Sequence, residues 1–191
     1  MTRYFITGNI NKFEEAKLLV PGIVQLDIDL REIQEIDSRK IIKAKILEAS
    51  LHHKGEFIVE DTSLSLDCLN KLPGPFIKWF EKMIGIKGIA DLAEKMGNTN
   101  AEAKATIGFL DDKNKMHFFE GSVLGDIVQP KVSGFGWDPI FQPKGYNKTF
   151  GQMSKEEKNH ISHRRQAFDN FIDFIKSKST QHQPDHCASL D

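Results

Sequence analysis

The order of strand-like and helix-like segments is the feature of this sequence that most limits its fold. Up to residue 60, short runs rich in β-branched and aromatic residues alternate with segments whose apolar residues recur at helical spacing. The strand-like runs cover residues 3–7, 23–30 and 56–60. Two longer runs, residues 101–110 and 116–128, follow with a turn between them. Strand–helix alternation followed by paired strands predicts an α/β fold with a mixed sheet.

Helix signals separate and follow these runs. Asn11, with Glu14 three residues later, is the predicted start of the first helix, and Pro21-Gly22 ends it. Ser38 is a predicted cap of the second helix. Further helices are predicted at residues 75–83 and 89–96, and a last one carries an apolar stripe of Ala167, Phe168, Phe171, Ile172 and Ile175.

Composition is typical of an ordinary globular protein. The 191 residues are 39% hydrophobic and 28% charged, with a formal net charge of −1. Because no overall basic field would attract nucleic acid or an anionic membrane, we expect neither as a partner. We expect one domain, with two lobes around a cleft, over residues 1–176, and a polar, disordered tail over residues 177–191.

Cysteine content and the length of apolar runs indicate the cellular compartment in which the protein is expected. Cys68 and Cys187 are too few for a disulfide framework or a cysteine-rich metal site. No run approaches the ~20 apolar residues that a membrane span needs, and no apolar signal core precedes the first strand. We therefore expect a protein of the reducing cytoplasm.

The first strand ends in a possible phosphate-binding turn. Thr7-Gly8-Asn9 is followed by Lys12 in the first helical turn. Free backbone N–H groups at a helix start attract phosphate, and glycine lets a phosphate approach the backbone. The alternative is an ordinary strand-to-helix turn. No Gly-x-x-x-x-Gly-Lys-Ser/Thr motif is present, which disfavours a P-loop NTPase.

The third strand ends in the acidic run Val59-Glu60-Asp61-Thr62. Two adjacent carboxylates are costly to place together without a cation, and they suit a hard ion such as Mg²⁺ and a base that activates water. Glu32, after the second strand, could add another carboxylate. The alternative is a solvated acidic turn, in which Glu32 is an ordinary surface residue.

Aromatic and glycine residues surround a single carboxylate in the segment Ser133-Gly134-Phe135-Gly136-Trp137-Asp138-Pro139. An aromatic ring can stack on a purine, which contributes roughly 1–3 kcal/mol per base in nucleic-acid complexes. The Asp138 carboxylate can accept a hydrogen bond from a base N–H. The alternative is a packed loop whose Trp137 and Phe135 belong to the core.

A cationic cluster lies near the start of the last helix, at Lys158-Asn159-His160-Ile161-Ser162-His163-Arg164-Arg165. If the helix starts at Ser162, cations in its first turn oppose the helix dipole, and a bound polyphosphate would remove that conflict. If it starts at Ser154, capped through Glu157, the conflict does not arise. A solvated basic face is the remaining alternative.

These motifs, in this order, resemble the inosine triphosphate pyrophosphatase family over about residues 3–175. The matching segments are Thr7-Gly8-Asn9 with Lys12, Val59-Glu60-Asp61-Thr62, residues 72–80, residues 135–139 and Ser162-His163-Arg164. The resemblance implies an elongated mixed sheet flanked by helices, two lobes around a nucleotide-binding cleft, and a homodimer. It also implies hydrolysis of ITP, dITP or XTP between the α and β phosphates, which cleanses the nucleotide pool, with Mg²⁺ as cofactor and Mn²⁺ as the alternative ion.

The resemblance also implies roles for individual residues. The catalytic set is Asp61 as general base with Lys12 and Lys78. The metal set is Glu32, Glu60 and Asp61. The substrate-binding set is Thr7, Gly8, Asn9, Lys12, Lys45, Thr62, Lys78, Phe135, Gly136, Trp137, Asp138, Lys158, Ser162, His163 and Arg164.

Two other functions remain open. One is the structurally related septum-inhibitor type of pyrophosphatase, which prefers modified or pyrimidine nucleotides; the motif at residues 135–139 argues against it. The other is a nucleotide- or RNA-binding module without catalysis. In such a module, the carboxylates of Glu60 and Asp61 would repel a phosphate bound beside them. Metal-dependent turnover would distinguish an enzyme from a binding module.

Overall fold

The computed structural model describes residues 2–180. Its strands are β1 (Arg3–Ile6), β2 (Val24–Leu26), β3 (Glu56–Leu66), β4 (Pro73–Gly74), β5 (Asn100–Leu110), β6 (Met116–Ile127) and β7 (Phe141–Pro143). Its α-helices are α1 (Ile10–Leu19), α2 (Ser38–His52), α3 (Ile77–Lys95), α4 (Lys155–Ile161) and α5 (His163–Thr180). Three short 3₁₀ segments cover Asp67–Leu69, Asp138–Ile140 and Phe150–Gln152.

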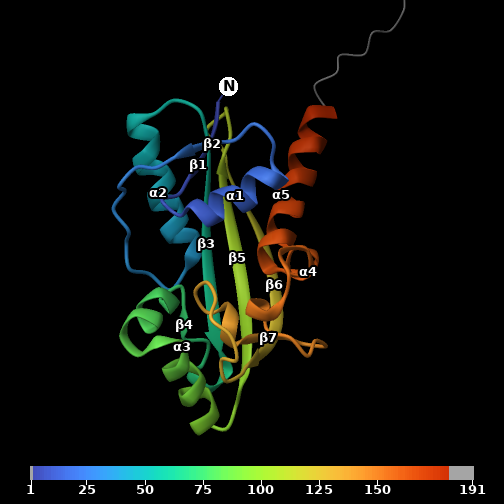
Figure 1. Ribbon diagram of the computed structural model, residues 1–191. Helices are drawn as coiled ribbons and strands as arrows, with labels where there is room; N and C mark the ends of the chain where they lie inside the picture. The colour runs from blue at the N-terminus through green and yellow to red at the C-terminus, as the bar shows by residue number, and fades with distance from the viewer. Residues whose placement is uncertain (1, 181–191) are drawn as a thin grey trace, which may run out of the picture.

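Within these residues the strands form one seven-stranded sheet, so the predicted mixed α/β fold is confirmed. The strand order is β2-β1-β3-β5-β6-β7, and β4 pairs with β3. β1 lies parallel to β2 and β3, whereas β3, β5, β6 and β7 are antiparallel neighbours. The long strands β3, β5 and β6 run along the length of the molecule (Figure 1).

Helices cover both faces of the sheet (Figure 1). Alternate residues of β3 point to opposite faces, as strand geometry requires. Phe57 and Val59 pack in a core cluster with α2, while Ile58 packs in a cluster with α1 and α5. A third cluster, at the other end of the sheet, joins Leu64 of β3 to Trp137 and to the second half of α3.

Several elements differ from their predicted bounds. β2 covers three residues rather than 23–30, and residues 27–37 then lead to α2 without regular structure. β3 extends to Leu66 because its second half pairs with β5 as far as Leu66–Ala101. The helices predicted at 75–83 and 89–96 are both parts of α3, which is kinked at Gly85 with φ of 68°.

Helix starts also differ from the prediction. Asn9 caps α1 and Asp37 caps α2, where the sequence suggested Asn11 and Ser38. In each case the capping side chain accepts hydrogen bonds from backbone N–H groups two or three residues later.

Both proposed starts of the last helix exist, because the segment forms two helices. Ser154 and Glu157 form the capping box of α4, and α5 begins at His163, immediately after Ser162. α5 continues to Thr180, four residues beyond the predicted boundary at 176. Its last turn is tied to the β5–β6 turn by an ion pair from Lys178 to Asp111. The rest of the predicted tail, 181–191, lies outside the described residues. No described helix combines the length and apolarity needed to cross a bilayer.

Candidate functional site

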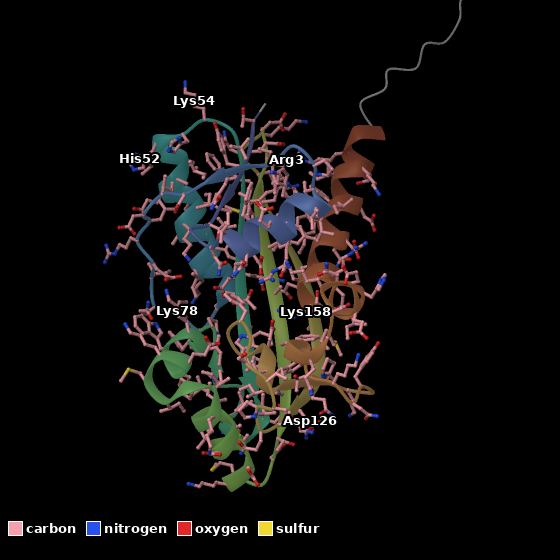
Figure 2. The ribbon with its side chains drawn as sticks, in the orientation of Figure 1. Arg3, His52, Lys54, Lys78, Asp126 and Lys158 are labelled. Carbon is pink, nitrogen blue, oxygen red and sulfur yellow. The ribbon has the colours of Figure 1, made fainter. Side chains whose placement is uncertain are left out.

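A cavity of about 710 Å³ lies where the first turn of α1, the start of α3 and the start of α5 meet. Figure 2 shows Lys78 on the α3 side and Lys158 on the α4 side. The lining includes these predicted residues: Thr7, Gly8, Asn9, Lys12, Glu32, Lys45, Glu60, Thr62, Lys78, Phe135, Gly136, Trp137, Asp138, Lys158, His163 and Arg164. Two predicted residues, Asp61 and Ser162, are not part of the lining.

The first turn of α1 forms one end of the cavity. Asn9 Oδ1 accepts hydrogen bonds from the N–H groups of Asn11 (3.0 Å) and Lys12 (3.2 Å), and Thr7 Oγ1 accepts one from the N–H of Asn9 (3.0 Å). Lys12 Nζ lies 3.4 Å from the hydroxyl of Thr62. Burial lowers the pKa of Lys12. The turn therefore presents a helix N-terminus and a poorly hydrated ammonium group to the cavity.

Glu60 is held by cations of the protein itself. Its oxygens lie 2.9 and 3.0 Å from Arg164 Nε, and Thr62 donates a hydrogen bond of 2.7 Å. Burial raises the pKa of this carboxyl, but Arg164 and Lys12 outweigh that effect and hold it at about 2. The Glu60 carboxylate is thus ionised and fully engaged.

Asp61, the next residue of β3, points to the other face of the sheet and bonds to Ser38. Its Oδ2 is buried and has no hydrogen-bond partner within the described residues. Burial raises the pKa of the Asp61 carboxyl, and the charge of Glu32 raises it further. Glu32 lies 2.5 Å from Lys45 and 3.8 Å from Lys78.

The predicted metal set of Glu32, Glu60 and Asp61 does not gather at one point. Within residues 2–180 no three His, Cys, Asp or Glu side chains are placed to hold one ion. The physical reason is strand geometry: consecutive side chains of a strand alternate between faces, so Glu60 meets Arg164 while Asp61 turns toward α2. Glu32 and Asp61 remain as a pair on the same side.

The aromatic loop, residues 133–139, lies at the other end of the cavity. It contains one aromatic residue that belongs to the core and one that is free to stack on a base. Trp137 is buried and packs against Phe141, Phe150 and His163, with ring centroids 5.6, 6.4 and 5.4 Å away. Phe135, in contrast, is 53% exposed. Trp137 is therefore a core residue that also lines the cavity, and Phe135 has an aromatic face available for stacking.

Asp138 is half-buried and His163 is buried beside this loop. Lys158 Nζ lies 2.5 Å from Asp138 Oδ2, and burial still raises the pKa of that carboxyl. Burial, followed by the charge of Arg164, lowers the pKa of His163 to about 3. His163 is consequently neutral at pH 7, and neither ring nitrogen has a hydrogen-bond partner among the described residues.

The cations at the start of α5 are neutralised by carboxylates of the protein. Arg164 pairs with Glu60 and with Glu15 of α1, and Arg165 pairs with Asp169 one turn along α5. These carboxylates remove the conflict with the helix dipole without a ligand. Ser162 is buried, and its hydroxyl accepts a hydrogen bond from the N–H of Arg165 (3.1 Å) instead of lining the cavity.

Sequence reasoning missed two carboxylates, Glu15 and Glu81. Glu15 holds Arg164, and Glu81 lines the cavity beside the aromatic loop. Each lies three residues after a predicted site lysine, Lys12 or Lys78, and therefore on the same helix face. That spacing was the available signal.

A model of the Ham1 family matches residues 3–174. The chain is 39% identical to an inosine triphosphate pyrophosphatase from Scheffersomyces stipitis, over 91% of this chain and 97% of that protein. It is 40% identical to one from Batrachochytrium dendrobatidis, over 92% and 94% of the two chains.

Solved structures of Ham1 proteins share the fold of this chain. The Staphylococcus aureus Ham1 protein superposes with a TM-score of 0.75 at 25% identity, over 93% of this chain and all of that one. A HAM1 protein from Coxiella burnetii, 22% identical over 93% and 100% of the two chains, shares the fold with a TM-score of 0.75. The matched family model and the extent of these relatives show that this chain belongs to the Ham1 family.

Proposed function

We propose that this protein hydrolyses the non-standard purine nucleoside triphosphates ITP, dITP and XTP to the monophosphate and pyrophosphate, and so cleanses the nucleotide pool. One observation carries the proposal. A single cavity has a helix N-terminus with lysines at one end and an aromatic loop with a half-buried Asp–Lys pair at the other. Those ends suit the triphosphate and the base of one nucleotide, and the curated relatives are named for this activity.

The triphosphate binds at the α1 end. The backbone N–H of Gly8 approaches the phosphate oxygens, and Lys12, Lys45 and Lys78 supply positive charge. Thr62 orients the Lys12 ammonium group. Glu60 keeps its place as a buried counter-ion of Arg164 and Lys12 rather than as a metal ligand.

Mg²⁺ fits the pair Glu32 and Asp61, and Mn²⁺, which favours the same oxygen ligands, is the alternative. Mg²⁺ is commonly held by one or two carboxylates together with substrate phosphates, so a third protein carboxylate is not needed. The buried Oδ2 of Asp61, without a partner in the described chain, is the observation that supports this fit. When bound, the ion withdraws charge from the phosphate oxygens.

Asp61 acts as the general base. Its raised pKa suits proton acceptance from water better than that of an ordinary carboxylate. The water oxygen attacks the α-phosphorus, the water proton passes to Asp61, and the bond from the α-phosphorus to the bridging oxygen breaks. Lys12 and Lys78 stabilise the charge on the departing pyrophosphate.

The base binds between Phe135 and the Asp138–Lys158 pair. Hypoxanthine presents an O6 acceptor beside an N1–H donor, and adenine reverses both. Lys158 donates to O6 and Asp138 accepts from N1–H. Adenine would place its 6-amino donor against Lys158 and its N1 acceptor against Asp138, which disfavours it by several kcal/mol. Arg164 supports this edge by holding the start of α5 against β3.

The protein acts in the cytoplasm as a homodimer in this proposal. An open sheet face beside α2 supports the dimer. A second cavity of about 400 Å³ lies there, and Leu72 and Leu124 are exposed near it. Exposed apolar residues beside polar groups are typical of protein interfaces.

The test is pyrophosphate release from ITP, XTP, GTP, ATP and dUTP, each with Mg²⁺ and with a chelator. We expect strong release from ITP and XTP that the chelator abolishes. Release of single phosphate, or equal turnover of ATP, would contradict the proposed chemistry or base pocket. No turnover by folded protein would favour a binding module.

Asp61→Asn tests the base. We expect turnover of ITP to fall by about 10²–10⁴-fold, because the amide cannot accept the water proton. Binding of ITP, measured by calorimetry, should change much less. Near wild-type turnover would exclude Asp61 as the base.

A further inference from the structure

A hydrogen bond between two exposed side chains joins the loop after β2 to the first turn of α3. Trp79 Nε1 donates this bond to Gln34 Oε1 over 3.0 Å. Each partner stands beside a charged residue of the cavity lining, because Gln34 closely follows Glu32 and Trp79 directly follows Lys78. Neither Gln34 nor Trp79 is among the described residues that line the cavity. The contact therefore lies next to the proposed phosphate end without being part of it.

The loop that carries Glu32 depends on side-chain contacts for its position. Residues 27–37 contain no regular structure and lead from β2 to α2 (Figure 1). Gln34 connects this loop to α3 through one amide group. Its Nε2 donates a long hydrogen bond of 3.5 Å to the carbonyl oxygen of Glu32, while its Oε1 accepts the bond from Trp79. Because the amide is planar, the position of Trp79 is passed on to the backbone of Glu32.

The half of α3 that carries Lys78 depends on such contacts as well. Gly85 has the non-helical angles φ 68° and ψ 169°, which interrupt the helix between residues 77–84 and 86–95. The side chain of Lys78 is 74% exposed, so it loses rotamer freedom only where a contact orients it. The Trp79 ring supplies that contact, since its centroid lies 5.9 Å from Lys78 Nζ and 5.6 Å from Lys82 Nζ, within the range of cation–π attraction.

We infer that Trp79 is a positioning residue, which acts through Gln34 and Lys78 to keep the loop and the helix in register. In that register Glu32 and Lys78 face each other, 3.8 Å apart. The inference rests on the proposed function, in which Glu32 holds Mg²⁺ and Lys78 stabilises departing pyrophosphate. Loss of the Gln34–Trp79 bond should therefore weaken binding at the phosphate end and leave the base end, at the aromatic loop, unchanged.

The experiment measures two affinities by calorimetry, one for pyrophosphate with Mg²⁺ and one for IMP. The variants are Trp79→Phe, which keeps a ring but loses the N–H donor, Gln34→Leu, which loses the acceptor, and the double variant. We expect the Kd for pyrophosphate to rise about three- to tenfold in each single variant, as the loss of one hydrogen bond predicts. The double variant should bind no more weakly than the single ones, because both changes remove the same bond. The Kd for IMP should stay within about twofold of wild type.

Met83→Ala is the matched control. Met83 lies one helical turn after Trp79 on the same half of α3, is 76% exposed, and is not among the described residues that line the cavity. This change should leave both affinities at their wild-type values. Thermal unfolding checks that each variant is folded, and if one single variant does not fold, the other decides.

Unchanged pyrophosphate affinity in the folded single variants would overturn the inference. Equal losses for pyrophosphate and IMP, or additive losses in the double variant, would overturn it too. The same holds if wild type binds no pyrophosphate, because Glu32 and Lys78 would then have no polyphosphate to meet. If wild type binds pyrophosphate but releases none from ITP, the proposed function fails, and the affinities of the variants still decide the role of Trp79.

Discussion

Burial changes what each charged residue of the cavity can do. Glu60 and Asp61 are neighbours in sequence, yet Glu60 is an ionised counter-ion, and Asp61 has a raised pKa and an Oδ2 without a hydrogen-bond partner in residues 2–180. Both carboxylates are removed from water, which disfavours their charged forms. Arg164 and Lys12 reverse that effect for Glu60, whereas burial prevails for Asp61, as a general base would require.

Glu60→Gln should destabilise the fold by about 3–5 kcal/mol, because it removes the more buried of the two carboxylates that compensate buried Arg164. Denaturant unfolding measures the change. Glu14→Gln on α1 is the control, since Glu14 is exposed, and we expect it to stay within about 0.5 kcal/mol of wild type. A similar stability for both variants would contradict the structural role of Glu60.

His163 should make stability depend on pH. Its pKa is lowered to about 3 in the folded state, so below the ordinary value of 6.5 the unfolded chain binds a proton that the folded chain does not. Stability is therefore complete above pH 6.5 and falls as pH drops toward 3, by up to about 1.4 kcal/mol per pH unit. His163→Phe, which keeps an aromatic ring, should flatten this slope in urea unfolding at several pH values. An unchanged slope would show that other groups cause it.

At the scale of elements, two glycines let helices approach the long strands closely. A Cβ on Gly108 would lie 2.2 Å from Ile42 of α2, and one on Gly121 would lie 2.3 Å from the carbonyl oxygen of His163. The atom that the Gly108 Cβ would meet belongs to a flexible side chain, whereas the atom that the Gly121 Cβ would meet belongs to the backbone of α5. The start of α5, with Arg164, is thus positioned by the missing side chain on β6.

Gly121→Ala should displace the start of α5, at a cost of about 1–3 kcal/mol or more, because backbone atoms cannot yield as a side chain does. Pyrophosphate release from ITP should fall with stability, since Arg164 and His163 move. Ser122→Ala, the next and exposed residue of β6, is the control. Full activity and stability of Gly121→Ala would show that α5 adapts to the methyl group.

At the scale of the whole molecule, one sheet joins the two ends of the cavity. β3 carries Glu60, Asp61 and Thr62 at its centre, and its later residues pack with the aromatic loop. The proposed phosphate and base ends of the cavity are therefore held at a distance set by strand geometry.

The open sheet face leads to a prediction about assembly. Light scattering should give a mass twice the 21.7 kDa of one chain. Leu124→Glu, an exposed position on that face, should shift the protein toward the monomer without loss of helical signal. A monomeric wild type at high concentration would contradict the homodimer.

Local sequence patterns predicted the elements well where local forces decide them. The capping box of Ser154 and Glu157, the apolar stripe of α5 and the long β5–β6 hairpin all follow from spacing and turn residues. The bounds of β2 and β3 could not be predicted from such local patterns, because the length of a strand depends on which neighbouring strands are available for pairing.

The sequence by itself determined the order of strands and helices, the motifs that gather around the cavity, and the family. These depend on residue type and spacing along the chain. Only the tertiary structure decided that Glu60 is held by Arg164, 104 residues away, that Trp137 is core while Phe135 is exposed, and that Glu81 has no partner in the described chain. Burial and ion pairing depend on segments distant in sequence, so spacing alone does not encode them.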